Sequence, residues 1–392
     1  MSNNAVIGQS GGPTAVINQS LVGCVEALQA SKEVGKIYGS QNGVRGMLED
    51  RFLELQGLDQ AKLDRIAGTP SAALGSSRDK PDADYAKKVF DVLERREIRY
   101  LFYIGGNDSS DTCRILNELA GNAGYDLRCF HVPKTIDNDL VGSDHTPGFP
   151  SAARFVAAAF MGDNLDNKSL PGIKLNIVMG RHAGFLTAAS LMARQLDTDG
   201  PHLIYVPEDA FDLDSFVADI DRMYTKHGRC LVAVSEGIHD AAGAPIVTKL
   251  QEQVEKDAHG NVQLSGTGAL GDHLVALVKE KMGKVRVRAD TFGYLQRCYP
   301  LGISEVDQRE ARAAAAKAVE CALEGEQDGS IAIKRVSDSP YRAAFERIEL
   351  TDVAAKTRVL PEEFRIGGND IAPSFRDYLA PLLGELPVIE QL

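Results

Sequence analysis

The sequence predicts an α/β protein built of two doubly wound lobes, with mostly parallel sheets and an active-site cleft between the lobes. Short apolar runs rich in β-branched residues alternate with longer helix-patterned stretches along the whole chain, which is the pattern of parallel βα units. Some runs are apolar without interruption, as in residues 101–104 (LFYI). Such strands are covered by helices on both faces.

The expected elements follow one another with short connections. Strands are expected at residues 4–9, 36–40, 100–105, 129–133, 174–180, 202–206, 230–236 and 284–288, with a further strand at 330–334. Helices are expected at residues 13–29, 83–96, 109–120, 151–167, 184–195, 212–227, 271–282 and 305–324.

No linker rich in Pro or Ser interrupts this pattern. We therefore place one lobe at residues 1–145 and the second at 146–335, with the chain crossing between them, and expect residues 336–392 to pack over the lobes. Residues 241–268 lack a strong period and resemble an insertion, to which we assign no purpose. Ligands of doubly wound sheets gather beyond the carboxyl ends of the strands, where this chain places many Gly, Asp and Arg residues.

The composition excludes several classes of protein. The 392 residues carry 43 Lys and Arg against 55 Asp and Glu, a formal charge of -12, which argues against a general binder of nucleic acid or of an anionic membrane. The six cysteines form no CxxC pair, so we expect reduced thiols, a cytoplasmic location and no structural zinc. No apolar run approaches the roughly 20 residues of a membrane span, and the first residues do not match a signal peptide.

Two glycine-rich loops follow expected strands. In the first, the strand at 4–9 runs into Ser10, Gly11, Gly12 and Pro13, and we expect a helix start there whose N–H groups favour an anion, although a Gly-Gly turn is also common without a ligand. In the second, the strand at 100–105 runs into GGNDS at residues 105–109. Its Asp and Ser could equally be helix caps. A near-copy, IGGND at 366–370, lacks a preceding strand and is expected to be a surface loop.

A third loop, HVPKTIDND at residues 131–139, is the most specific. It places Lys134, Asp137 and Asp139 within six residues at the end of an apolar strand. An extended segment would put the two carboxylates on one side together with Thr135. This arrangement suits a general base and a hydrated metal ion, and a plain surface turn is the alternative.

Seven motifs occur in the order seen in the phosphofructokinases: SGGP (10–13), LGSSR (74–78), GGNDS (105–109), PKTIDND (133–139), MGRHAG (179–184), SEG (235–237) and YLQR (294–297). The chain resembles the pyrophosphate-dependent branch of this family from about residue 4 to residue 335. The resemblance implies phosphoryl transfer to the 1-hydroxyl of fructose 6-phosphate, with residues 1–145 binding the donor and 146–335 the sugar phosphate.

The resemblance also implies a role for individual residues on the donor side. Asp137 matches the general base. Asp139 and Asn107 match the positions that hold Mg²⁺, the expected cofactor. The donor phosphates are expected at Gly11, Gly12, Gly106 and Ser109, and Arg78 is expected to reach the transferred group. Lys134, which would balance the departing phosphate, and Asp108 are counted with Asp137 and Arg78 as catalytic residues.

On the sugar side, the implied binding residues are Thr135, Ile136, Asp137, Met179, Gly180, Arg181, Glu236, Arg288, Tyr294 and Arg297. Tyr294 and Arg297 would bind the 6-phosphate, a group that suits the planar fork of arginine. Arg288 matches an arginine that reaches the substrate of a neighbouring subunit. A homo-oligomer is therefore expected, and a dimer is the first choice. Taken one at a time, these residues could instead be surface ion-pair partners, caps or core edges. We assign no role to His182 and expect a buried, satisfied histidine there.

Two positions bear on the phosphoryl donor. In the ATP-dependent branch the positions of Asp108 and Lys134 hold small residues. A carboxylate about 4 Å from the α-phosphate would oppose ATP by about 4 kcal/mol at an effective dielectric constant of 20. We therefore expect pyrophosphate as the donor and a reversible reaction that yields fructose 1,6-bisphosphate and phosphate.

One position departs from the family pattern, which usually has Asp where this chain has Asn107. A neutral side chain coordinates a metal ion more weakly than a carboxylate. The alternatives left open are an ATP-dependent enzyme, a kinase of another sugar phosphate such as sedoheptulose 7-phosphate, and a catalytically silent regulatory subunit.

Overall fold

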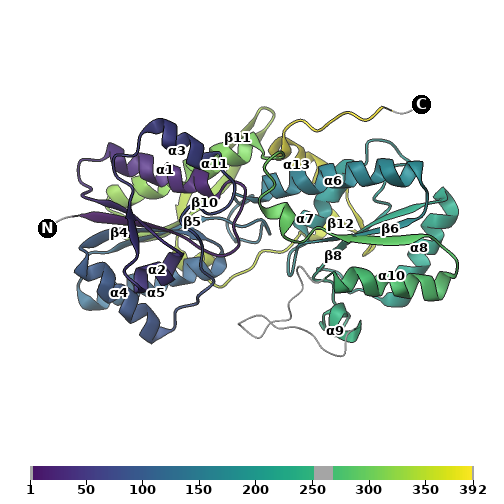
Figure 1. The fold of residues 1–392 in the computed structure, drawn as a ribbon, viewed down its shortest axis with the longest axis horizontal. Coiled ribbons are helices and arrows are strands. Elements are labelled where there is room, and N and C mark those ends of the chain that lie inside the picture. Colours follow the sequence, from purple (N-terminus) through teal and green to yellow (C-terminus); the bar gives the residue numbers. More distant parts are fainter. Residues whose placement is uncertain (1–2, 251–267, 391–392) are drawn as a thin grey trace. The chain divides into compact units, whose positions relative to one another are not determined.

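The computed structural model describes residues 3–250 and 268–390 (Figure 1). The expected insertion at 241–268 therefore lies largely outside the described residues. The chain forms two compact units, each assembled from two stretches of sequence. Unit 1 comprises Met1–Ser151 with Arg297–Arg358, and unit 2 comprises Ala152–Gln296 with Val359–Leu392.

Unit 1 contains a seven-stranded sheet in the order β11-β10-β5-β4-β1-β2-β3. The five central strands are parallel, and the two edge strands run antiparallel to their neighbours. The strands are β1 (Asn4–Gln9), β2 (Ile37–Ser40), β3 (Phe52–Glu54), β4 (Ile98–Gly105), β5 (Arg128–Pro133), β10 (Asp328–Asp338) and β11 (Tyr341–Ile348). The expected α/β class with mostly parallel strands is confirmed.

Helices cover both faces of this sheet (Figure 1). One apolar core lies under α1 (Ile17–Ala30), α3 (Gln60–Ala67) and α11 (Glu305–Leu323). The other lies under α2 (Gly43–Leu48), α4 (Ala83–Arg95), α5 (Asn107–Ala123) and α12 (Leu350–Val353). Burial on both faces explains why β4 is apolar without interruption from Tyr100 to Gly105.

Unit 2 contains a four-stranded parallel sheet in the order β7-β8-β6-β9. Its strands are β6 (Ile173–Val178), β7 (Leu203–Tyr205), β8 (Cys230–Ser235) and β9 (Val287–Thr291). Its helices are most of α6 (Phe149–Ser169), α7 (Phe185–Ala188), α8 (Leu213–His227), α9 (Ile246–Leu250), α10 (Ala269–Met282) and α13 (Ser374–Leu383), with the 3₁₀ turns η1 (Ala189–Ala193), η2 (Gly293–Arg297) and η3 (Glu362–Phe364).

The division of the chain differs from the boundaries expected from the sequence. Residues 297–335, expected in the second lobe, belong to unit 1 because β10 pairs in parallel with β5 and α11 packs against α1. The C-terminal segment is also shared, since residues up to Arg358 belong to unit 1 and those from Val359 belong to unit 2.

Three local expectations are corrected as well. The helix expected at 184–195 is broken into α7 and η1, and the strand expected at 284–288 begins at Val287. The helix expected from Pro13 begins only at Ile17. The near-copy at 366–370 forms the turn of a small hairpin, β12 (Arg365–Ile366) and β13 (Asp370–Ile371), as a surface loop would.

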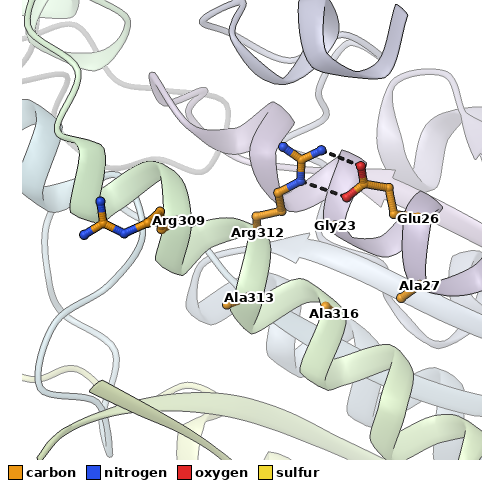
Figure 2. Close-up of a pocket in the computed structure, with 7 residues that line it drawn as sticks. All are labelled: Gly23, Glu26, Ala27, Arg309, Arg312, Ala313 and Ala316. Atoms are coloured by element: carbon orange, nitrogen blue, oxygen red, sulfur yellow. Dashed lines mark hydrogen bonds and ion pairs between the residues drawn. The ribbon is translucent and has the colours of Figure 1, made fainter. Parts of the chain in front are cut away.

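Helices α1 and α11 approach closely because α1 carries a glycine at the contact. A Cβ atom on Gly23 would lie 2.3 Å from the backbone oxygen of Arg312. Beside this contact, Arg312 forms a two-pronged ion pair with Glu26 (Figure 2). The hollow there, about 520 Å³ in volume, is lined by Gly23, Glu26, Ala27, Arg309, Arg312, Ala313 and Ala316. None of the candidate site residues lines it.

Candidate active site

The three loops singled out in the sequence lie side by side in unit 1. They follow β1, β4 and β5, which are neighbours in the sheet. The backbone N–H of Lys134 donates to Gly105 O at 2.9 Å, and that of Ser10 donates to Ile104 O at 2.9 Å. The hydroxyls of Ser10 and Ser109 are 2.5 Å apart. The carboxyl edge of this sheet is therefore the place where the candidate donor, metal and base residues meet.

Close packing of these loops depends on a glycine at the end of β4. A Cβ atom at Gly105 would lie 2.0 Å from the hydroxyl oxygen of Ser109 and 2.2 Å from that of Ser10. No side chain fits in this space. The two serines can therefore hydrogen bond across the end of the strand only because position 105 lacks a side chain.

The first loop differs from the expected helix start. Gly11 has a φ of 72°, and its N–H donates to Ser77 O at 2.8 Å, so this N–H is already used. By contrast, α5 begins directly at the second loop, with Gly106 as its N-cap and Asn107 and Asp108 in the first turn. The positive end of a 17-residue helix therefore faces this loop, which is an environment that favours an anion.

The ammonium group of Lys134 is buried against the first loop. Its Nζ donates to Gly12 O at 2.7 Å and lies 3.1 Å from the position that a Cβ on Gly11 would occupy. Burial lowers the pKa of Lys134 to about 8, and the positive charge of Arg297 adds to this effect, while Asp137 and Asp139 oppose it. Lys134 is thus a cation whose charge is sensitive to weakly alkaline pH.

Arg297 lies over the same loop. A Cβ atom on Gly12 would meet the Cζ atom of the Arg297 guanidinium at 3.1 Å. The resemblance grouped Arg297 with Tyr294 at the sugar 6-phosphate, yet the structure places Arg297 beside the first loop of unit 1. Tyr294 belongs to unit 2 and is about half exposed, at 49%.

The two carboxylates of the third loop are brought together by a turn rather than by an extended strand. The N–H of Asp137 donates to the hydroxyl of Thr135 at 3.0 Å, and Asn138 has a φ of 59°. Burial and the nearby charge of Asp137 raise the pKa of Asp139 well above its ordinary value. The expected reason for their proximity, alternation along a strand, is therefore wrong.

Asn107 provides an oxygen beside this carboxylate. Its Nδ2 donates to Asp139 Oδ2 at 3.0 Å, and its Oδ1 is buried and pairs with no group in residues 3–250 or 268–390. Carboxylate and amide oxygens are the ligands that Mg²⁺ prefers, and Mg²⁺ commonly takes only one or two protein ligands besides substrate oxygens. The described part of the chain has no cluster of three or more His, Cys, Asp or Glu residues for a metal. Asn107 Oδ1 and the Asp139 carboxylate are therefore two adjacent oxygen groups that could hold a divalent metal ion.

Arg78 and Asp108 are exposed at the rim of these loops. The carboxylate of Asp108, 66% exposed, pairs with Lys80 Nζ at 3.0 Å. Next to Arg78, the carboxylate of Asp79 accepts from the guanidinium of Arg45 and from the hydroxyl of Tyr85 at 2.8 Å. The sequence did not indicate Lys80 and Asp79, because charged residues that follow a glycine-serine loop, as residues 78–80 do, are typical of a solvent-exposed turn.

Unit 2 carries a second group of candidate residues. Met179, Gly180 and Arg181 follow β6, Glu236 follows β8, and these two strands are paired through Val178 and Ser235. The hydroxyl of Ser235 donates to Gly180 O at 2.6 Å. Gly180 has a φ of 147°, which favours glycine. The MGR and SEG loops are therefore locked together, with the side chain of Glu236 largely buried.

The remaining candidates of unit 2 are exposed. Arg288 lies on the edge strand β9, and its guanidinium donates to the backbone oxygen of Val287 at 2.9 Å. His182 is exposed rather than buried, which corrects the expectation for that residue. Within the described residues no helix is long and apolar enough to cross a membrane.

Comparison with known proteins places this geometry in context. The family model described as "Phosphofructokinase" matches residues 4–322. A pyrophosphate–fructose 6-phosphate 1-phosphotransferase of Rhodospirillum rubrum is 57% identical over 380 residues, which is 97% of this chain and 94% of the relative. Solved structures of pyrophosphate-dependent phosphofructokinases are similar throughout. That of Nitrosospira multiformis has a TM-score of 0.88 at 33% identity (100% and 95% of the chains), and that of Marinobacter aquaeolei 0.86 at 32% (99% and 94%).

Proposed function

Because this chain belongs to the phosphofructokinase family, we propose that it transfers a phosphoryl group from pyrophosphate to the 1-hydroxyl of fructose 6-phosphate. The products are fructose 1,6-bisphosphate and phosphate. The reaction is reversible because it exchanges one phosphoanhydride bond, that of pyrophosphate, without a nucleotide. The observation that carries the choice of donor is the buried ammonium of Lys134 on the Gly11–Gly12 loop. It joins Arg297 in placing two cations where a small, highly charged donor would bind.

The residues of unit 1 divide the chemistry among them. Asp137 accepts the proton of the 1-hydroxyl while the oxygen of that hydroxyl forms a bond to the transferred phosphorus. The bond from that phosphorus to the bridging oxygen of pyrophosphate breaks, and Lys134 and Arg297 stabilise the charge that builds on the departing phosphate. The N-terminus of α5 and the loop residues Gly12, Gly106 and Ser109 hold the donor oxygens, and Arg78 reaches the transferred group. Gly11, whose own N–H is bonded to Ser77 O, lines the same loop without a side chain that would obstruct the donor.

Asn107 Oδ1 and Asp139 would hold the metal ion. When bound, Mg²⁺ neutralises phosphate oxygens and so reduces the repulsion that the nucleophile meets. The amide of Asn107 also donates to Asp139, which fixes the carboxylate in one orientation. The departure from the family pattern at Asn107 is thus compatible with metal binding.

Unit 2 supplies the groups for the sugar. Glu236 accepts hydrogen bonds from sugar hydroxyls, and Met179, Gly180 and Arg181 line the sugar, together with Thr135 and Ile136 of unit 1. The resemblance pairs Tyr294 with Arg297 at the 6-phosphate. Tyr294 keeps that role in the proposal, and Arg297, which lies against Gly12 of the first loop, is assigned to the donor. Arg288, exposed on β9, reaches the substrate of a second copy in a homodimer. The six cysteines are free thiols, in keeping with a cytoplasmic enzyme.

The test is the initial rate with fructose 6-phosphate and Mg²⁺, with pyrophosphate or ATP as the donor in parallel reactions and a chelator control. We expect activity with pyrophosphate that the chelator abolishes. Activity with ATP alone would refute the donor assignment and leave the family unaffected. Inactivity with both donors would refute the proposed function and leave two alternatives, a kinase of another sugar phosphate such as sedoheptulose 7-phosphate and a catalytically silent subunit.

A further inference from the structure

The turn that carries Thr135 and Asp137 is held in place by a second loop, residues 140–148, which we call the support loop. The N–H of Thr135 donates to Pro147 O at 3.1 Å, and the hydroxyl of Thr146 donates to Thr135 O at 3.0 Å. Thr135 and Gly148 also form a parallel bridge. The position of the catalytic turn therefore depends on the position of the support loop.

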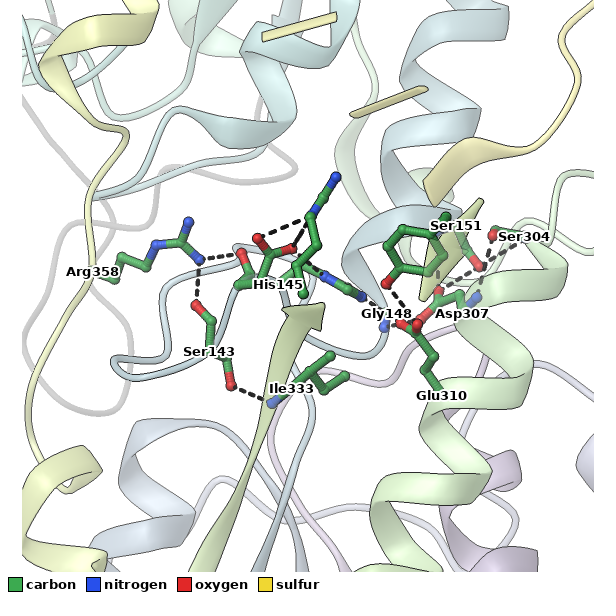
Figure 3. A network of polar contacts seen from close by, with 12 residues as sticks. Ser143, His145, Gly148, Ser151, Ser304, Asp307, Glu310, Ile333 and Arg358 are labelled. Atoms are coloured by element: carbon green, nitrogen blue, oxygen red, sulfur yellow. Dashed lines mark hydrogen bonds and ion pairs between the residues drawn. The ribbon is translucent and has the colours of Figure 1, made fainter. Parts of the chain in front are cut away.

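One end of the support loop is fixed by Asp307, a fully buried residue of α11. Its carboxylate accepts from the N–H of Gly148 at 2.8 Å, the N–H of Ser151 at 3.0 Å and the hydroxyl of Ser151 at 2.6 Å (Figure 3). These N–H groups lie at the start of α6, where the helix itself offers no acceptor. A carboxylate from another helix thus caps α6 and anchors the support loop.

The middle of the support loop is fixed by His145, whose ring is buried between two carboxylates. Its Nε2 is 2.5 Å from Glu310 Oε2, and its Nδ1 is 2.8 Å from Asp144 Oδ2. The other oxygen of Glu310 accepts from the hydroxyl of Tyr341 at 2.6 Å. Because both ring nitrogens face carboxylate oxygens, both carry protons, and the ring is an imidazolium. The guanidinium of Arg335 pairs with Asp144 and balances its charge.

The backbone of the support loop is equally constrained. Asp144 N–H donates to Ile333 O at 2.8 Å, and Ile333 N–H donates to the hydroxyl of Ser143. Arg358 donates from its guanidinium to the backbone oxygens of Ser143 and Asp144, and from its own N–H to Asp139 O at 2.8 Å. Arg358 thus binds both the support loop and Asp139, the last residue of the catalytic turn.

We propose that Asp307, Glu310 and His145 form a clamp that positions Thr135, Asp137 and Asp139 for phosphoryl transfer. The proposal rests on the proposed function, and none of the three clamp residues touches the reacting groups. Burying charged groups costs free energy, and apolar packing of the same space is often no less stabilising. A buried polar network in which every group is hydrogen bonded holds the surrounding backbone in one conformation. A base and a metal ligand two residues apart need that single conformation.

The test compares Asp307→Asn and Glu310→Gln with Gln308→Ala, a control on the same helix whose side chain bonds to Gln19 instead. In Asp307→Asn only one of the two side-chain oxygens remains, so either Gly148 or Ser151 loses its acceptor. In Glu310→Gln the negative charge that faces His145 is removed. We expect kcat to fall by about tenfold to a hundredfold in both clamp variants, with a raised half-saturating Mg²⁺ concentration. The KM for fructose 6-phosphate is expected to change less than kcat, because most of the residues assigned to the sugar belong to unit 2 and only Thr135 and Ile136 belong to the turn.

Hydrogen exchange gives a readout that does not depend on activity. The amides of residues 135–148 are expected to exchange faster in the clamp variants than in Gln308→Ala. Leu63→Ala, a cavity variant in α3 of unit 1, controls for lost stability alone and keeps the wild-type kcat. If Asp307→Asn does not fold, Glu310→Gln carries the test, since it preserves the shape of the side chain.

The outcomes separate the clamp from the function. An inactive wild-type protein would refute the proposed function, and the exchange data would still judge the clamp. An active wild type with clamp variants that match Gln308→Ala in kcat, Mg²⁺ dependence and exchange would overturn the clamp alone. Clamp variants that lose only stability, as Leu63→Ala does, would show that the network is structural.

Discussion

The ammonium of Lys134 donates a 2.7 Å hydrogen bond to the backbone oxygen of Gly12, although the two residues are 122 positions apart in the chain. The bond links the loop after β5 to the loop after β1. We expect Lys134→Met to lower kcat with pyrophosphate by about 10²-fold, the usual loss when one group that stabilises transition-state charge is removed. Lys62→Met, at an exposed position of α3, is the matched control and should leave the rate unchanged.

The pH dependence of the same residue gives a second prediction. The pKa of Lys134 is lowered to about 8, so its positive charge is present below this pH and is lost as the pH rises through it. The rate with pyrophosphate should therefore decline above about pH 8. In Lys134→Arg, whatever activity remains should keep its level to higher pH, because arginine stays protonated. An unchanged alkaline limb in that variant would assign it to another group.

Asp108→Gly tests the exclusion of ATP. Asp108 is exposed and paired with Lys80, so solvent and the partner charge weaken its repulsion of a nucleotide below the estimate made from the sequence. We expect the substitution to raise the rate with ATP by roughly tenfold, less than the thousandfold that 4 kcal/mol would give. Asp111→Ala, on the same helix, should not raise it. ATP activity that stays absent in Asp108→Gly would refute the role of this carboxylate.

Asn107→Asp tests the metal position. A second carboxylate beside Asp139 increases the ligand charge, and we expect the half-saturating Mg²⁺ concentration to fall by roughly threefold to tenfold at pH 8. The added charge also raises the pKa of Asp139 further. The advantage should therefore disappear as the pH falls and the pair binds a proton. A titration of the rate with Mg²⁺ at two pH values measures both effects.

Gly105→Ala should disrupt the junction of the first two loops. Its Cβ would lie 2.0 Å from the hydroxyl oxygen of Ser109, and such overpacking costs about 1–3 kcal/mol. Gly121→Ala is the control, because this position in α5 has open space around it and alanine is preferred to glycine in a helix by about 1 kcal/mol. Chemical denaturation should show opposite signs for the two variants.

The stability of unit 1 should depend on the charge of His145. Its carboxylate neighbours raise its pKa above the ordinary value despite burial, so the stabilisation is complete below the unfolded-state pKa of about 6.5 and is lost as the pH rises through the raised value. The melting temperature of the wild type should fall over that range, and that of His145→Gln should change less. The charged or titratable groups facing the ring are Asp144, Glu310, Asp307, Arg335 and Tyr341.

Some elements could be predicted from the sequence because the signal is local. The central strands β1, β4 and β5 are mostly apolar, and the loops after them contain the glycine and acidic motifs. The edge strands β3 and β11 were not predicted, because they are only partly buried and therefore lack an apolar run. The break between α7 and η1 also leaves no mark in the periodicity.

The candidate site was predictable in composition and less so in geometry. The order of motifs indicated Asp137, Asp139 and Asn107, but not the turn at Asn138 that brings the two carboxylates together. Asp307 was missed because a carboxylate near the start of a helix reads as a solvated cap. Its burial depends on the start of α6, 156 positions away, and a contact at that separation has no local signal.

The composite make-up of unit 1 affects how the chain is synthesised. While the ribosome has produced only the residues up to β9, β5 has no partner on one side and α1 has no α11 against it. An unpaired strand edge beside an uncovered apolar helix is a site for unwanted association. The catalytic turn directly follows β5, so it is completed only after β10 emerges. A nascent chain truncated before Asp328 should therefore need chaperone protection and should bind no donor.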